Sequence, residues 1–281
     1  MVGFGALYVA HRVFGAKVDS PYPRPMLPPS LSLPEFEPTI NKDTEREAVI
    51  VLISSTVLLL VFFYWGRAGF YTRSGLIDWV PDIIGGPFVE FPGIGGYLWW
   101  GLASLVMRVL IPLAIIVFFI KRPPRAYGFR LSGISKHLPM YGGMYLLMFP
   151  VLFIVSGFDS FETFYPFYSR AAEGGTAFWL YESGYALQFI GVEAFFRGFM
   201  TFGLLRRFGW LAIPVMTVPY TMIHFTKPMP EAAAAILAGL VLGYMAVRSK
   251  SFVPGVFLHV GVAITMDLLV LWRAGALGNI L

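Results

Sequence analysis

Glu193 and Arg197 lie four residues apart within a long apolar stretch, in the segment Val192-Glu193-Ala194-Phe195-Phe196-Arg197-Gly198. A bare charge in such surroundings costs several kcal/mol or changes its protonation state. On a helix, residues four apart share one face, so this carboxylate and guanidinium can pair. The pattern has two interpretations: an ion pair that stabilises a helix bundle, and an active site within the membrane.

Two histidines downstream, His224 and His259, bear on the second interpretation. A carboxylate and two imidazoles in a dry pocket can activate water by general acid–base catalysis. The carboxylate accepts a proton, one imidazole orients the water, and a donor stabilises the developing oxyanion. A covalent nucleophile is not indicated, because the chain has no cysteine and its serines form no Gly-x-Ser-x-Gly elbow or Ser/Lys dyad.

Two histidines and one glutamate are also a known catalytic zinc ligand set. The chain has no His-Glu-x-x-His motif, and neither histidine has a carboxylate close in sequence that would orient it. We therefore expect no metal and no other cofactor. Among the remaining ionisable residues in apolar runs, Arg108 is expected to pack in the bundle or to snorkel, and Glu182 and Asp267 are expected to be structural or interfacial.

These residues belong to a chain of 281 residues that is 57% hydrophobic and only 13% charged. Its apolar runs are about 20 residues long, the length of a helix that crosses a bilayer, and they lack the alternation of a membrane β-barrel. We predict an all-α, polytopic membrane protein with about seven transmembrane helices in one bundle. The predicted spans are at about 47–66, 95–120, 138–157, 176–204, 209–225, 230–248 and 252–272.

The first 45 residues differ from the rest. A short apolar piece from Phe4 to Phe14 is too short to span a bilayer and is predicted to be an interfacial helix. A proline-rich stretch from Pro21 to Pro38 is predicted to be extended polyproline II. We divide the chain into this N-terminal segment, residues 1–45, and the helical bundle, residues 46–281, whose motif-bearing core is 138–272.

The net charge of +5 comes from lysines and arginines at the ends of apolar runs, which is typical of membrane topology rather than of nucleic-acid binding. The connection from Lys121 to Lys136 is the most basic and is predicted to be cytoplasmic, which also makes the N-terminus cytoplasmic.

This orientation gives an estimate of how deep each site residue lies in the membrane. Counting at ~1.5 Å per residue from the cytoplasmic ends of the helices puts Glu193, His224 and His259 at depths of ~16, ~22 and ~11 Å, which overlap within the uncertainty of the helix ends. One cluster near the middle of the membrane is therefore expected.

The pattern Glu193-x-x-x-Arg197-Gly198, then Tyr220-x-x-x-His224, then His259 resembles the glutamic intramembrane endopeptidases of the CPBP family. That family includes CaaX prenyl proteases of the Rce1 type and the Abi-type bacteriocin-processing and immunity proteins. The resemblance covers roughly residues 138–272. It implies that Glu193 and Arg197 form the first motif, that Tyr220 supports the second, that His224 binds the activated water, and that His259 donates to the oxyanion.

Two positions depart from the family pattern. Val192 stands where the pattern has a first glutamate, the residue taken as the base, and Ala263 stands where it has an asparagine. A shift of one residue rotates a helical side chain by about 100°, so Glu193 does not simply take the place of the missing group. We expect Glu193 to act as the base in this chain.

The sequence thus predicts an intramembrane endopeptidase that uses a water activated by glutamate and histidine to cleave a membrane-anchored or lipidated protein or peptide. The alternative is a catalytically inactive relative that acts as a membrane binding, immunity or chaperone-like protein. A transporter is more distant, because no internal repeat is visible. The expected setting is multi-pass in a bacterial or archaeal plasma membrane, with lipid and the substrate as partners and no nucleic acid.

Overall fold

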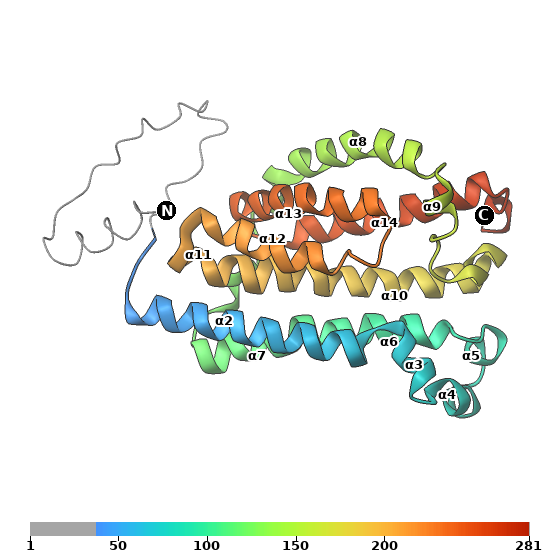
Figure 1. The fold of residues 1–281 in the computed structure, drawn as a ribbon, viewed down its shortest axis with the longest axis horizontal. Helices are drawn as coiled ribbons and strands as arrows, with labels where there is room; N and C mark the ends of the chain where they lie inside the picture. The colour runs from blue at the N-terminus through green and yellow to red at the C-terminus, as the bar shows by residue number, and fades with distance from the viewer. Residues whose placement is uncertain (1–37, 281) are drawn as a thin grey trace, which may run out of the picture. The chain divides into compact units, whose positions relative to one another are not determined.

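The structure is a computed structural model that describes residues 38–280. The predictions for Phe4–Phe14 and for nearly all of the proline-rich segment concern residues outside this range. Within residues 38–280 every regular element is helical and there is no strand (Figure 1). This confirms the all-α fold class.

The helices follow one another with short connections, and several α-helices continue directly into π-helical or 3₁₀ turns. The first half of the described chain contains α2 (Lys42–Val61), η1 (Phe62–Gly66), α3 (Ala68–Arg73), α4 (Leu76–Ile84), α5 (Pro87–Glu90), α6 (Ile94–Leu105), η2 (Val106–Leu110), α7 (Ile111–Ala114), η3 (Ile115–Ile120), η4 (Pro124–Tyr127), η5 (Ile134–His137) and α8 (Leu138–Val155). The second half contains α9 (Asp159–Glu162), η6 (Ser169–Glu173), α10 (Gly175–Glu193), η7 (Ala194–Phe202), α11 (Gly203–Phe208), η8 (Gly209–Leu211), α12 (Ala212–Met222), α13 (Met229–Ser249), α14 (Val253–Arg273) and η9 (Leu277–Asn279).

Five helical segments among the described residues are long and apolar enough to cross a membrane: Lys42–Gly66, Ile94–Ile120, Ile134–Val155, Met229–Ser249 and Val253–Arg273. They agree with five of the predicted spans. The other two, 176–204 and 209–225, do not meet these criteria. Polar residues such as Glu182 and Glu193 lower the hydropathy of the first, and α12 in the second has only 11 residues. The count of seven spans therefore stays a prediction.

The long helix formed by α10, η7 and α11 lies at the centre of the packing. It contacts α6 on one side and α14 on another, while α12 packs against α13 and η7, and α8 packs against α14 (Figure 1). Glycines allow the closest approach: a Cβ atom added at Gly184 of α10 would lie 2.6 Å from the Tyr97 carbonyl oxygen of α6. Every side chain from Ala194 to Met200 is buried, as expected for a helix surrounded by others.

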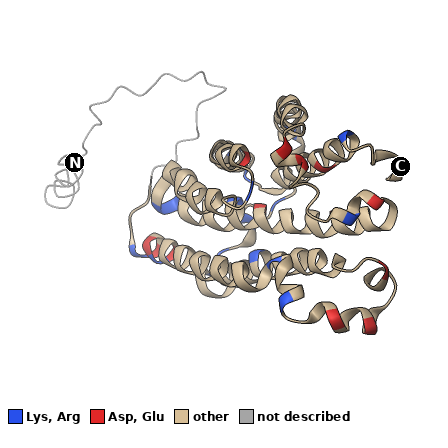
Figure 2. Ribbon diagram, turned by 45° about the vertical axis from the view of Figure 1, so that its right-hand side comes forward, with Lys and Arg blue, Asp and Glu red and all other residues tan. Residues whose placement is uncertain are grey.

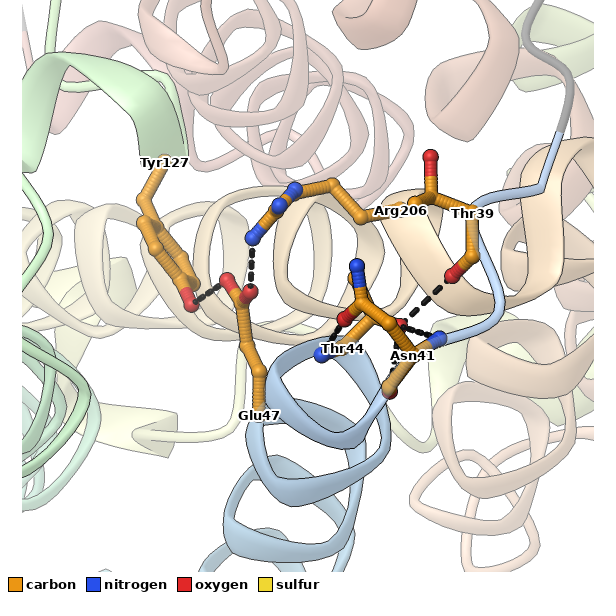
Figure 3. Close-up of polar contacts among 6 residues, drawn as sticks. All are labelled: Thr39, Asn41, Thr44, Glu47, Tyr127 and Arg206. Atoms are coloured by element: carbon orange, nitrogen blue, oxygen red, sulfur yellow. Dashed lines mark hydrogen bonds and ion pairs between the residues drawn. The ribbon is translucent and has the colours of Figure 1, made fainter.

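Charged residues gather mainly toward the ends of the long helices and leave long uncharged stretches between them (Figure 2). At the start of α2, Asn41 caps the helix together with Thr44. Glu47, only 5% exposed, accepts hydrogen bonds from the Tyr127 hydroxyl at 2.5 Å and from Arg206 at 2.8 Å (Figure 3). These contacts tie α2 to η4 and α11 at one end of the bundle, and Glu47 and Arg206 also line a pocket of about 180 Å³.

The hydrogen bond between Tyr127 and Glu47 has a defined direction. Burial, and then the contact with Glu47, raise the pKa of the Tyr127 hydroxyl, which lies in the connection after η3. The hydroxyl therefore keeps its proton and remains the donor.

Arg108 is also buried in the bundle. Its guanidinium lies 3.6 Å from the centroid of the Phe62 ring, so this residue packs inside the bundle.

Candidate active site

The ion pair between Glu193 and Arg197 is formed. Glu193 is the last residue of α10, and Arg197 lies in the π-helical segment η7 that follows. The Oε1 atom of Glu193 is 3.2 Å from the Nη1 atom of Arg197, and both side chains are completely buried. Such π-helical segments are frequent at functional sites because they change which side chains share a face. This change of helix type is not visible in the sequence.

His259 joins this pair from α14. Its Nδ1 atom is 2.8 Å from Oε1 of Glu193, so that a single carboxylate oxygen contacts both the imidazole and the guanidinium. The ring centroid of Phe189, one turn before Glu193 on α10, lies 4.2 Å from that of the imidazole. The ring is thus held between a carboxylate and an aromatic face. With 15% of its side chain exposed, His259 is more accessible than Glu193.

The other carboxylate oxygen, Oε2 of Glu193, is buried and has no hydrogen-bond partner within residues 38–280. It lies against the backbone of Gly255: a Cβ atom at that position would be only 2.8 Å away. Gly255 therefore provides the room that the carboxylate occupies. Gly255 is not among the residues predicted for the site, although its spacing of four residues before His259 on the same helix is a usable signal.

Tyr220 contacts Arg197, and His224 in turn contacts Tyr220. The Arg197 guanidinium lies 3.9 Å from the centroid of the Tyr220 ring, and that ring lies 4.7 Å from the ring of His224. Because α12 ends at Met222, His224 is in the turn that follows the helix. Its Nδ1 atom is 2.8 Å from the Tyr220 carbonyl oxygen. A carbonyl only accepts, so Nδ1 carries the proton and, in the neutral ring, Nε2 has the free lone pair.

The predicted residues therefore form one connected network. In order of contact it is His259, Glu193, Arg197, Tyr220 and His224. It draws on α10, η7, α12 with its following turn, and α14. The contact of His259 with Glu193 is direct, whereas His224 is linked to Glu193 through Arg197 and Tyr220.

The two positions that depart from the family pattern are filled by packed apolar side chains. Val192 is buried in a core cluster with Phe195 and Phe199. Ala263 is buried among aromatic residues that include Phe178 and Tyr181. Neither position brings a polar side-chain atom to the network.

The donor set does not favour a metal ion. Oε1 of Glu193 already contacts the cationic Arg197, and a second positive charge at the same oxygen would be repelled. Within residues 38–280 no three histidine, cysteine, aspartate or glutamate side chains are grouped in a way that could hold a metal. The expected absence of a metal remains a prediction.

The comparisons with known proteins gave one finding. Residues 175–265 match the family described as type II CAAX prenyl endopeptidase Rce1-like. Neither the curated proteins nor the solved structures gave a significant match to the chain. The matched range begins at the first residue of α10 and ends within α14, so it contains every member of the network. The chain therefore carries an Rce1-like domain over residues 175–265, as its motifs predicted, and the family is one of proteases.

Proposed function

We propose that the chain is an intramembrane endopeptidase that hydrolyses a peptide bond of a membrane-anchored or lipidated substrate. The observation that carries the proposal is the hydrogen bond between His259 and Glu193 at 2.8 Å, formed beside a buried Arg197. A carboxylate that orients an imidazole is a recurring arrangement for activating a nucleophile. The match to a protease family and the apolar helices that flank the site support the same reading.

The direction of the hydrogen bond between His259 and Glu193 supports a specific atom as the acceptor of the proton from water. Because a carboxylate only accepts, Nδ1 of His259 carries a hydrogen and its Nε2 has the lone pair. The ring is partly exposed, whereas Glu193 is completely buried. We therefore assign the proton transfer to Nε2 of His259, with Glu193 stabilising the imidazolium that forms. In this proposal Glu193 is the partner of the base, whereas the sequence led us to expect it to be the base itself.

In the proposed hydrolysis, His259 carries one proton from the water to the leaving amine. Nε2 of His259 takes a proton from water, and the hydroxide oxygen bonds to the carbonyl carbon of the substrate. Nε2 of His224 accepts the second hydrogen of that water and orients it. The protonated Nε2 of His259 then donates to the developing oxyanion and passes its proton to the leaving amine as the C–N bond breaks. The donor role that the resemblance implied for His259 thus follows the first proton transfer.

One observation favours the alternative of a non-catalytic binding protein. Val192 and Ala263 are apolar and packed at two positions where the family pattern has polar groups. A protein that had lost its chemistry would show such replacements. One cleavage experiment distinguishes the endopeptidase from the non-catalytic binding protein.

The experiment measures cleavage of a prenylated peptide by the full chain in lipid nanodiscs. Wild type is compared with Glu193→Gln, His259→Ala and His224→Ala, and with Glu162→Gln as a control for an exposed carboxylate on α9. We expect each of the three site variants to lower kcat by about 10²- to 10⁴-fold while thermal unfolding stays cooperative, and the control to cleave normally. Peptide that binds wild type and Glu193→Gln equally well without being cleaved by either would support the binding protein instead.

A further inference from the structure

A second buried polar cluster lies on the two helices that carry Glu193 and His259. Glu182 is about three turns before Glu193 on α10, and Asp267 is about two turns after His259 on α14. Because α10 and α14 contact each other, both residues lie toward the same end of the bundle. They belong neither to the network described above nor to any motif of the family resemblance. Both side chains are buried within the protein, since Glu182 is 3% exposed and Asp267 is 0% exposed.

This cluster is short of hydrogen-bond donors. Both carboxyl oxygens of Glu182 and the Oδ1 atom of Asp267 are buried without a hydrogen-bond partner within the described residues. The Oδ2 atom of Asp267 accepts a hydrogen bond of 3.0 Å from the Tyr181 hydroxyl. One hydroxyl donor therefore serves two buried carboxyl groups, although an ionised carboxylate with no donor is among the costliest groups to bury.

The two side chains also contact each other, close enough for a hydrogen bond between the carboxyl groups. Two ionised carboxylates cannot form one, because each only accepts. They would instead place like charges side by side in a dry interior, which strongly disfavours ionisation of both. A positive charge between the oxygens removes both costs.

The surrounding groups do not supply that charge. The titratable and charged side chains that act on this pair are Tyr97 of α6, Tyr165 before η6, Tyr181 and Tyr185 of α10, and Lys227 and Glu231 at the start of α13. Lys227 is engaged with Glu231 at 2.5 Å and with the Tyr165 hydroxyl at 3.1 Å. Its ammonium group donates no hydrogen bond to Glu182 or Asp267.

The chemistry favours a proton over a metal ion. The side-chain oxygens in the cluster come from Glu182, Asp267 and Tyr181, fewer than the six to eight ligands that Ca²⁺ takes. The nearby ammonium of Lys227 would further repel a metal cation. A proton needs only one oxygen from each of the two interacting carboxyl groups.

We propose that Glu182 and Asp267 form a proton-binding site in which the two carboxyl groups share one proton that joins α10 to α14. The shared proton holds together the two helices that place Glu193 against His259. At high pH the proton leaves, the two carboxylates repel, and the helices separate at this end. The effect on cleavage rests on the proposed function, whereas the proton site itself does not.

The test follows thermal unfolding of the full chain in nanodiscs as pH rises from about 5 to about 10. Stability is present while the proton is bound and is lost as pH rises, by up to about tenfold in the unfolding equilibrium constant per pH unit for one proton. Glu182→Gln replaces the shared proton by a permanent amide donor. We expect this variant to lose the corresponding part of the alkaline decline, while Glu162→Gln declines as wild type does.

A second measurement detects the bound proton directly rather than through stability. Difference infrared spectroscopy of the wild type should show the carbonyl band of a buried protonated carboxyl group, and the band should disappear in Asp267→Asn. An alkaline decline of Glu182→Gln equal to that of wild type would overturn the proposal. So would stabilisation of wild type, but not of Glu182→Gln, by added Na⁺ or Ca²⁺, because the ligand would then be a metal ion. Both readouts hold whether or not the chain cleaves peptides.

Discussion

Gly255 offers the sharpest test of the site geometry, because a single added methyl group would press on the carboxylate of Glu193. The Cβ atom of Gly255→Ala would lie 2.8 Å from Oε2, whereas an ordinary contact begins at 3.4 Å. The carboxylate must therefore retreat by about 0.6 Å. It is held on its other side by His259 at 2.8 Å and Arg197 at 3.2 Å, so its retreat disturbs those contacts as well.

The effect of Gly255→Ala on the unfolding free energy and its effect on the cleavage rate can be estimated separately. Overpacking of a tight interior costs about 1–3 kcal/mol of unfolding free energy, partly offset by the better helix propensity of alanine, about 0.5–1 kcal/mol. Misplacement of a catalytic group by about 1 Å can cost about 10²-fold in rate, so a shift of half that size should cost about tenfold. We expect Gly255→Ala to unfold near the wild-type temperature and to cleave about tenfold more slowly.

The assay is cleavage of the prenylated peptide in nanodiscs, with thermal unfolding measured on the same samples. Gly142→Ala is the matched control, because it adds a methyl group to α8 where no atom lies within 4 Å. In a Glu193→Asp background the shorter side chain leaves room for the methyl group, so Gly255→Ala should cost little more. Full activity of Gly255→Ala beside an inactive Glu193→Gln would refute the placement of Oε2 against residue 255.

Three further outcomes are expected. Arg197→Met should lower the unfolding free energy by about 3–5 kcal/mol, since it leaves the buried Glu193 with the hydrogen bond from His259 but without its permanent positive charge, and the double variant with Glu193→Gln should lose less. Equal losses in a denaturation assay would contradict the pair. Glu47→Ala should cost about 1–3 kcal/mol and Tyr127→Phe about 1 kcal/mol in the same assay, and a Glu47→Ala chain as stable as wild type would contradict the bridge. Ser132→Cys, the sole cysteine of that variant, should react with an impermeant thiol reagent only from the cytoplasmic side, and labelling from outside intact cells would invert the topology.

The amino-acid sequence was enough to predict the helical fold class and the ion pair of the candidate site. Apolar runs of the length of a bilayer require helices, because lipid leaves backbone groups no other partner. The same cost applied to side chains singles out Glu193 and Arg197, which must pair when they are buried. Periodicity along one helix is a local property, so their pairing was predictable from spacing alone, and it is present in the structure.

The number of membrane spans was harder to predict from the sequence than the fold class. The segment 176–204 contains Glu193 and Arg197 of the candidate site as well as Glu182, and their polarity makes it less apolar than the flanking helices. Neighbouring helices cover this segment, so its burial could not be predicted from its own hydropathy. α12 is shorter than the predicted span, and the turn after it is what lets His224 Nδ1 reach a backbone carbonyl.

Contacts between side chains on different helices could not be predicted from the sequence and came from the three-dimensional packing. The contact of His259 with Glu193, the place of Oε2 against Gly255, and the pairing of Glu182 with Asp267 each join α10 or its continuation to α14. Such contacts depend on how far each helix is rotated about its axis and how closely the two backbones approach. Packing among many side chains sets both quantities, so neither can be read from spacing within one helix.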